Sequence, residues 1–590
     1  MTDNTIKSRA WPWIEGLLLA LIVLVALTMG GESARVSYHG YLHTTIGEAV
    51  LSDGLLPENP YHAGEALNYY TLYPTLGVLI GRLGMGALWG FAIINILAAL
   101  LMGPALDSLT KRLQFSFAVR RASFWCMLLG FNLLGYYFAR GVSVPPLGAM
   151  PFAILEPMTN VGELFSWDAR LQSFVTKFLN VSSFACSLPL MLFALSNAIE
   201  DTKRSRLLAA ILLGLCIALN PLVGAFSVLL IVGQALLCNS GEIMSQIIAW
   251  AKLGIVSSII AVPFIAPLFL NAGASAAPDK QLPFVGDGAF FNILGPCLLL
   301  VLMSAFVVLK LNTKQQKVIL LASILAVMFS FSSLPFSNEY KFPRLFAIFL
   351  AIPAGSMIVH YVKGWAQMWA PINGWVPMFA LGALVIQSIP TMFSTIKAYA
   401  YWNVSQSLPL TTSSNGDLVS RLVDDNLQPA IPQSVLEAIQ ELDSDAVIMM
   451  HPRFPKVASM AQGNQWAPAL QHTLLVDRPQ IHNYAYSPEV LSRLGLVVSF
   501  WGSNDWPATA GPDNYAPQPA LSQLRQIVAG RSLAILSTAS STASHDYLNK
   551  LRDSGDVSLV AGQGDVYLWL FSAVPKAGGN QAPAEHLLER

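Results

Sequence analysis

Long apolar runs recur along the first two thirds of the sequence, and they limit what the chain can fold into. Most of them approach the length of a helix that crosses a bilayer, about 20 residues. Hydrophobic residues make up 54% of the 590 residues, which excludes an ordinary soluble protein. We expect a multispanning α-helical membrane protein. The runs are Trp11–Met29, Gly86–Leu106, Ala122–Phe138, Val181–Leu195, Leu207–Leu237, Ile247–Leu268, Ile293–Val308, Val318–Phe331, Leu345–Tyr361 and Val376–Ile389.

Lys and Arg residues gather between alternate runs, and this pattern predicts which loops face the cytoplasm. The run Leu207–Leu237 is interrupted by Asn220-Pro221, where proline disfavours a continuous helix, so we expect two short helices to meet near the outer face. About eleven crossings then place every basic cluster inside and the N-terminus in the cytoplasm. The clusters are Lys7 and Arg9; Lys111, Arg112, Arg120 and Arg121; Lys203, Arg204 and Arg206; Lys310, Lys314 and Lys317; and Lys363.

The last third of the chain has a different pattern, in which short β-rich runs alternate with helix-like pieces. Such alternation is typical of an α/β domain with a mainly parallel sheet. We therefore expect a membrane domain over residues 1–397 and a soluble α/β domain over residues 398–590, on the outer side. The expected strands are Ala446–Met450, Leu533–Leu536, Ser558–Val560 and Val566–Phe571, and the expected helices are Val435–Leu442, Leu521–Ala529 and Tyr547–Leu551.

Three polar loops are expected on the outer side, and each holds an acidic residue among basic or aromatic ones. The first loop follows the first apolar run and ends at a short segment suited to an interfacial helix with aromatic anchors. It contains Glu32, His39, His43, Tyr69 and Tyr70. The second loop contains Arg140, Asp168, Arg170 and Lys177, and the third contains Glu339, Lys341 and Arg344.

These residue types suit group transfer at a membrane surface. A carboxylate there can act as a general base toward an acceptor hydroxyl. Two or three carboxylates from different loops could instead hold a divalent cation, Mg²⁺ or Mn²⁺, although no residue is assigned to a metal. Lys and Arg suit the phosphate of a lipid-linked donor, Arg by a bidentate fork and Lys as a point charge.

Plainer interpretations stand beside these. Glu32 can be a solvated helix end, and Asp168 with Arg170 a surface ion pair that contributes little. The charges of the third loop can be interfacial residues whose side chains reach water. Asn180 and Asn220 can be polar contacts between helices.

Two segments, HGYLHTTIGEAVLSDGLLPENPYHAGEALNYY and NEYKFPRLFAIFLAIP, together with the order of spans and loops, resemble the GT-C superfamily. These are multispanning glycosyltransferases that take sugars from polyprenyl-phosphate carriers. The resemblance implies that Glu32 matches the first-loop catalytic acid, Asp168 a second-loop acid and Glu339 the acid before the following span. Unlike some members, this chain has no paired acids in the first loop and no Trp-Trp-Asp in its tail, which argues against protein N-glycosylation.

The leading hypothesis is therefore an inverting glycosyltransferase of the plasma (bacterial inner) membrane. It transfers a sugar from a polyprenyl-phosphate donor to a glycan, lipid or protein acceptor on the outer face, and it needs no nucleic acid. Its candidate substrate-binding residues are His39, His43, Tyr69, Tyr70, Arg140, Arg170, Lys177, Lys341 and Arg344. The alternatives are a transporter or flippase for a lipid-linked glycan, and a non-catalytic membrane assembly protein.

Overall fold

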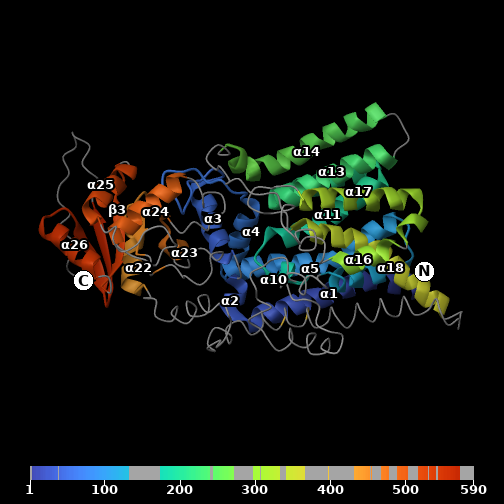
Figure 1. Ribbon diagram of the computed structural model, residues 1–590, viewed down its shortest axis with the longest axis horizontal. Helices are drawn as coiled ribbons and strands as arrows, with labels where there is room; N and C mark the ends of the chain where they lie inside the picture. The colour runs from blue at the N-terminus through green and yellow to red at the C-terminus, as the bar shows by residue number, and fades with distance from the viewer. Residues whose placement is uncertain are drawn as a thin grey trace. The chain divides into compact units, whose positions relative to one another are not determined.

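The computed structural model shows a chain built from two compact units (Figure 1). The first unit contains Met1–Gly47, Tyr69–Leu270 and Ala277–Val419, and it is helical where described. The second unit includes Glu48–Asn68 and Ser420–Arg590, and it holds a β-sheet. The structure describes residues 3–36, 39–131, 173–238, 243–270, 297–305, 307–331, 341–365, 392, 396, 431–451, 454, 467–476, 488–501, 516–528, 530–539 and 542–571.

Helices make up the described part of the first unit. Five of them are long and apolar enough to cross a membrane: Ala10–Met29, Ala87–Arg112, Ser183–Glu200, Ile248–Leu270 and Phe342–His360. The predicted number of about eleven crossings stays a prediction. The helices are α1 (Asp3–Met29), α2 (Gly31–Val36), α3 (Gly40–Asp53), α4 (Leu72–Gly81), α5 (Ala87–Arg112), α6 (Phe117–Leu129), α10 (Thr176–Leu179), α11 (Ser183–Glu200), α12 (Lys203–Leu219), α13 (Pro221–Cys238), α14 (Ile243–Leu270), α16 (Leu298–Ala305), α17 (Thr313–Ser330) and α18 (Phe342–Trp365).

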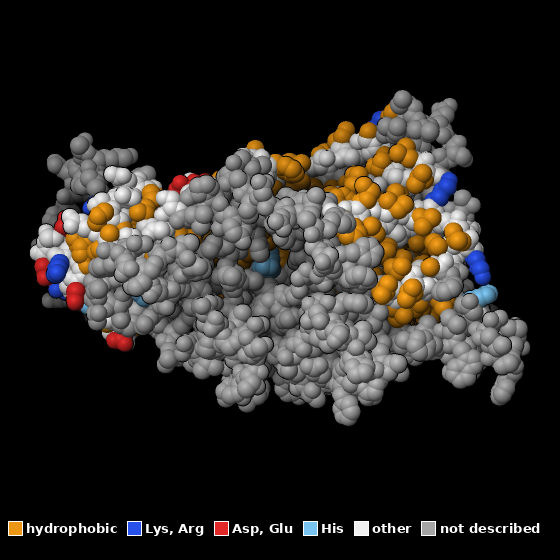
Figure 2. Space-filling view, in the orientation of Figure 1, with side chains coloured by type: hydrophobic (Ala, Val, Ile, Leu, Met, Phe, Trp, Pro, Cys, Tyr) orange, Lys and Arg blue, Asp and Glu red, His pale blue; other side chains and the backbone are white. Residues whose placement is uncertain are grey.

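Large apolar side chains cover the outside of several of these helices. On α14 they include Ile255, Ile259 and Phe269, each more than 60% exposed, and α17 carries Met328 at 63%. Figure 2 shows such side chains gathered over α13, α14 and α17. In water a contiguous apolar surface of this kind would be costly, so we assign it to the lipid.

Polar side chains fix where three of the helices begin. Ser116 caps α6 by accepting a hydrogen bond from the Val119 amide. At α12, Thr202 and Ser205 satisfy each other's backbone amides, and Asn312 does the same with Gln315 at α17. Such caps satisfy amides that the first turn leaves without a partner.

The helix ends that the sequence predicts to be cytoplasmic lie together. Arg112, at the end of α5, forms an ion pair with Glu200 at the end of α11, with 2.7 Å between Nη2 and Oε2. Gln315 Nε2 at the start of α17 donates to the carbonyl of Leu113, and Lys317 Nζ donates to Leu237 O. These contacts agree with the prediction that the basic clusters between alternate runs face the same side of the membrane.

Helices α12 and α13 meet at Asn220-Pro221, as the sequence predicts. Asn220 has an extended backbone (φ −146°, ψ 101°) and ends α12, and α13 begins at Pro221. The Asn220 side chain then accepts from the Val223 amide at 3.2 Å. The break thus replaces lost helical hydrogen bonds with side-chain ones.

The second unit contains a five-stranded sheet in the order β2-β1-β3-β5-β4. Strands β1, β3, β4 and β5 begin within one residue of their predicted positions. Every residue of the central strand β3 is buried. The strands are β1 (Val447–Met450), β2 (Thr473–Leu474), β3 (Leu533–Thr538), β4 (Ser558–Gln563) and β5 (Val566–Phe571), and the helices are α22 (Gln433–Gln440), α23 (Ala467–Leu470), α24 (Pro488–Trp501), α25 (Pro517–Ile527) and α26 (Thr542–Asp553).

The prediction of a mainly parallel sheet was wrong. Strand β1 runs parallel to β2 and β3, whereas β5 runs antiparallel to both β3 and β4. The physical reason lies in the two residues between β4 and β5, Gly564 and Asp565. A two-residue connection makes a hairpin, because a parallel pair needs a crossover of a dozen residues or more.

Residues of the first loop are part of this second unit. Ala63 is 2% exposed and belongs to the same hydrophobic core as Val447, Ile535, Leu524 and Trp569. The core of the sheet therefore includes a residue that lies nearly 400 positions earlier in the sequence than the first strand.

Candidate functional site

Four basic side chains from three segments converge in the first unit. His43 lies on α3 and Lys177 on α10, while Lys341 and Arg344 lie at the start of α18. His43 is 1% exposed, Lys177 4% and Arg344 0%. The sequence predicted all four as substrate-binding residues on separate loops, and the structure brings them together.

The charges of Lys341 and Arg344 act on the proton binding of the neighbouring basic groups. Burial, and then the charges of Arg344 and Lys341, lower the pKa of Lys177 well below that of a free lysine. Burial and the charge of Arg344 lower the pKa of Lys341 to about 8. Burial and the charge of Lys341 lower the pKa of His43 to about 3, so its imidazole is neutral at pH 7. At pH 7 Lys341 therefore still carries a positive charge, whereas His43 does not.

Aromatic rings form the wall beside Arg344. The guanidinium carbon lies 4.9 Å from the centre of the Phe131 ring, in cation–π geometry. Phe131 in turn contacts Phe174, with ring centroids 6.2 Å apart. Arginine can bind phosphate oxygens as a bidentate fork, so Arg344 is a candidate ligand for a phosphate.

His43 is surrounded by rings. Its imidazole lies 5.0 Å from Tyr73, 5.7 Å from Tyr69 and 5.9 Å from His39, measured between centroids. His39 and His43 share one turn, since the His43 amide bonds to the His39 carbonyl. Among the residues that the structure describes, no group of three or more His, Cys, Asp or Glu side chains is placed to hold a metal ion.

A chain of hydroxyl groups leads from Tyr69 to the helix break. Tyr69 Oη donates to Tyr70 Oη at 3.2 Å, and Ser183 Oγ donates to the same Tyr70 oxygen at 2.9 Å. Asn220 Nδ2 donates to Ser183 Oγ at 2.9 Å. Burial raises the pKa of Tyr70, so the phenol stays protonated. The predicted binding residues Tyr69 and Tyr70 are thus joined to the start of α11 and the end of α12.

A second polar link joins Asn180, which the sequence offers as a contact between helices, to Asn95, which was not singled out. Asn95, in the middle of α5, accepts from Tyr73 Oη at 3.3 Å and donates to the carbonyl of Asn180. Asn95 and Asn180 are 1% and 5% exposed. A lone asparagine within an apolar run was the only sequence signal for this contact, which now fixes α5 against the end of α10.

Glu32 lies on α2 and is exposed. Its Oε1 accepts a hydrogen bond from Tyr41 Oη at 3.1 Å. Tyr41 is two residues from both His39 and His43, and on a helix that offset is about 200°, so Tyr41 points away from the histidines. The hydrogen bond links Glu32 of α2 to α3.

Four predicted residues lie outside the described part of the chain. They are Arg140, Asp168, Arg170 and Glu339. Two of them are near the basic group in sequence, since Asp168 precedes Lys177 by nine positions and Glu339 precedes Lys341 by two.

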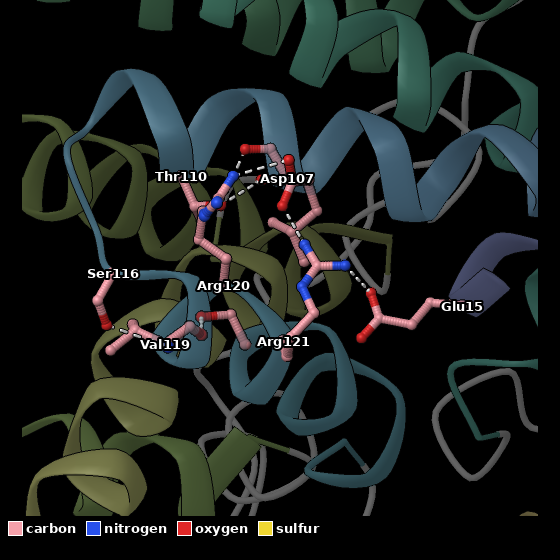
Figure 3. Close-up of polar contacts among 9 residues, drawn as sticks. Glu15, Asp107, Thr110, Ser116, Val119, Arg120 and Arg121 are labelled. Atoms are coloured by element: carbon pink, nitrogen blue, oxygen red, sulfur yellow. Dashed lines mark hydrogen bonds and ion pairs between the residues drawn. The ribbon is translucent and has the colours of Figure 1, made fainter. Parts of the chain in front are cut away.

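At the other end of the helices lies a buried ion-pair cluster (Figure 3). Arg121 binds both Glu15 of α1 and Asp107 of α5, and Arg120 Nη1 lies 2.9 Å from Asp107 Oδ2. The sequence places Arg120 and Arg121 in a loop, and this interpretation needs correction. The two arginines lie in α6, and Glu15 is 2% exposed inside a candidate span. The cluster satisfies its own charges, as buried ions must.

Comparison with known proteins finds similar solved structures but no match by sequence. No protein-family model matches the sequence, and no curated protein matches it. Two similar solved structures are those of ArnT from Cupriavidus metallidurans, one bound to undecaprenyl phosphate and one in the apo state.

The two matches extend over nearly all of both chains. The first covers 95% of this chain and 99% of that one at a TM-score of 0.47, and the second covers 93% and 97% at 0.48. Both are 12% identical in sequence. A likeness at this level does not transfer an activity, which depends on the residues of the site.

Proposed function

We propose that this protein is a membrane glycosyltransferase of the GT-C type. It transfers a sugar from a polyprenyl-phosphate-linked donor to an acceptor on the outer face of the membrane, with inversion at the anomeric carbon. The single observation that carries the proposal is the convergence of His43, Lys177, Lys341 and Arg344.

The location of this group supports a lipid-borne phosphate. Arg344 lies two residues inside the candidate span Phe342–His360, and Lys341 lies just before it. Charged groups at the boundary of the hydrocarbon meet a phosphate whose prenyl chain remains in the bilayer. The cations stabilise the phosphate that leaves when the sugar is transferred, where its charge increases.

The proposed roles of the remaining residues follow. Glu32 is proposed as the base that accepts the proton of the acceptor hydroxyl, with Asp168 and Glu339 as the next candidates. Tyr69 and Tyr70 offer hydroxyls and ring faces to the sugar, and Asn220 borders the lipid cavity at the helix break.

A transporter for a lipid-linked glycan is the main rival. Transporters place ionisable groups near the middle of the membrane, on the path of the substrate. Here the described ionisable groups inside the candidate spans include Glu15 and Asp107, which lie near the ends of theirs and are paired with Arg121. That arrangement favours a fixed structural role for them.

Transfer of label from a polyprenyl-phosphate sugar pool in purified membranes tests the proposal. We expect Lys341→Ala to raise the donor KM, because a hydrogen bond to a charged group contributes roughly 1.5–3 kcal/mol, or about 10- to 100-fold in affinity. The matched control is Lys314→Ala, which removes an exposed lysine at the start of α17. Membranes that move labelled lipid across the bilayer but transfer no sugar would support the transporter instead.

A further inference from the structure

The distal half of the first loop is folded into the C-terminal sheet. Residues 57–67, here termed the loop insert, close on themselves through the hydrogen bonds Leu67 N to Pro57 O (3.1 Å) and Asn59 N to Glu65 O (2.7 Å). Tyr61 and Ala63 of the insert are 1% and 2% exposed. The insert is thus a compact and mostly buried element of the second unit.

Strand β2 binds the backbone of the insert. Leu474 donates its amide to Pro60 O at 2.9 Å and accepts from the Ala63 amide at 3.0 Å. An edge strand offers such unpaired groups, and the insert satisfies them. Hydrogen bonds of this kind are directional, so they fix the insert in position as well as contributing to its stability.

Two arginines of the C-terminal part add charged contacts. Arg531 Nη1 lies 2.6 Å from Glu58 Oε1. Arg493 donates through Nη1 to the carbonyl oxygens of Ala63 and Leu475, and its side chain is only 6% exposed. A buried charged donor on two carbonyls is costly to remove, since both acceptors then lose a strong partner.

The chain that enters and leaves the insert carries residues of the candidate site. Helix α3 is continuous from Gly40 to Asp53, so His43 lies on the same rigid rod, about 15 Å from the end that leads into the insert. On the other side only Asn68 separates the insert from Tyr69 and Tyr70.

We infer that Glu58, Arg493 and Arg531 are positioning residues for the donor site. They hold the loop insert on the sheet, and the insert in turn fixes the ends of the chain that present His43, Tyr69 and Tyr70. This inference rests on the proposed function, because it concerns the same site. In this proposal the C-terminal unit contributes to catalysis by positioning the insert, and none of its residues touches the substrate.

Two measurements on the full-length protein in detergent test the inference. The first is hydrogen exchange of peptides that contain Ala63 and Leu474. The second is equilibrium binding of polyprenyl monophosphate, together with kcat/KM for the lipid-linked donor. The variants are Arg493→Ala and, as matched control, Arg552→Ala, whose exposed side chain pairs with the neighbouring Asp553.

In Arg493→Ala we expect the insert to exchange at least about ten-fold faster, since a charged hydrogen bond is lost. We expect kcat/KM to fall about 10- to 100-fold, because misplacement of a site by about 1 Å has effects of that size. Arg552→Ala should change neither quantity. Faster exchange of the insert with unchanged binding and kcat/KM would overturn the inference, and so would unchanged exchange.

A second variant is needed in case Arg493→Ala unfolds the sheet as well as releasing the insert. Ala63→Leu acts from the side of the loop by overfilling the core, and it leaves Arg493 in place. The exchange of β3 amides must stay slow in the variant that is used. A wild-type protein that does not bind polyprenyl monophosphate would overturn the proposed function and this inference with it, whereas a wild type that binds and an Ala63→Leu variant that binds equally well would overturn the inference alone.

Discussion

The charge of Lys341 changes within the range of pH that can be tested near neutrality. Its pKa of about 8 results from burial and from repulsion by Arg344. Below that pH the ammonium is charged and attracts the donor phosphate, and above it the charge is lost. His43 stays neutral throughout, and the pKa of Lys177 is lowered as well.

The affinity for the lipid-linked donor should therefore fall as pH rises through about 8. The donor is a phosphodiester whose single charge does not change in this range, so the change belongs to the protein. In Lys341→Arg the guanidinium stays charged over this range of pH. The rise in donor KM that is due to loss of the Lys341 charge should therefore disappear. Donor KM from pH 6.5 to about 9.5 is the measurement, and superimposable wild-type and Lys341→Arg profiles would contradict the assignment.

Glu32 is the proposed base, and its prediction is independent of the phosphate site. General-base assistance is worth about 10²–10⁴-fold, so Glu32→Gln should lower kcat by that factor while expression stays normal. Tyr41→Phe removes the hydrogen bond to Glu32 but leaves the carboxylate. Asp53→Asn, at the exposed end of α3, is the control. Equal effects of Glu32→Gln and Tyr41→Phe on kcat would show that Glu32 acts through its hydrogen bond to Tyr41 and not as the base. Asp168 would then be the next candidate base.

At the scale of the elements, α1 and α5 pack side by side through two glycines. A Cβ atom at Gly16 would overlap the carbonyl oxygen of Leu100, and one at Gly103 would overlap that of Pro12. Close backbone approach through small residues is a common way for helices to associate in membranes, where apolar side chains gain little by meeting. The contact brings Glu15 and Asp107 to the same arginine.

Gly16→Ala should destabilise the protein by about 1–3 kcal/mol, because backbone at this contact must move apart. Gly254→Ala is the matched control: it lies within α14, and apart from the neighbouring backbone of that helix no described atom lies within 4 Å of the added carbon. Alanine there should be neutral or stabilising by up to about 1 kcal/mol. Thermal unfolding in detergent compares the two, and a Tm of Gly16→Ala equal to that of the wild type would show that the helices separate without cost.

For the whole molecule, the loop insert constrains the topology. The first loop and the C-terminal sheet share one folded unit, so both must lie on one side of the membrane. The number of crossings between Tyr69 and the C-terminal unit is then even. The predicted ten crossings after the first satisfy this condition.

Labelling of single added cysteines with a membrane-impermeant reagent in intact cells measures the sides. We expect Asp53→Cys and Ser522→Cys to be labelled, and Lys111→Cys and Arg204→Cys to be protected until the membrane is opened. The wild type, in which Cys126, Cys186, Cys216 and Cys297 are buried, gives the background. Different results for Asp53→Cys and Ser522→Cys would rule out the shared unit.

Local patterns predicted much of this structure. The runs that form β1, β3 and β5, the break at Asn220, and the basic residues of the third loop all follow from a few neighbouring residues. The antiparallel hairpin of β4 and β5 was also within reach, since only Gly564 and Asp565 separate the strands.

Contacts between distant segments could not be predicted in the same way. Glu15 and Arg121 are 106 positions apart, and each looks like an ordinary charge near a span end. The meeting of His43 with Lys341, and of Ala63 with the sheet, depends on how helices pack. Packing of this kind leaves no periodic signal in a single sequence.

The loop insert also sets a problem of timing during synthesis. Glu58 and its partner Thr473 are 415 positions apart, and Arg531 is further still. At about 5–20 residues per second, a ribosome needs roughly 20 to 80 s to produce the strand that the insert joins. Throughout that interval the first loop waits with Tyr61 and Ala63 uncovered by the sheet, while the helices that follow it are synthesised. Biogenesis of this protein therefore depends on protecting an early segment until the last domain emerges.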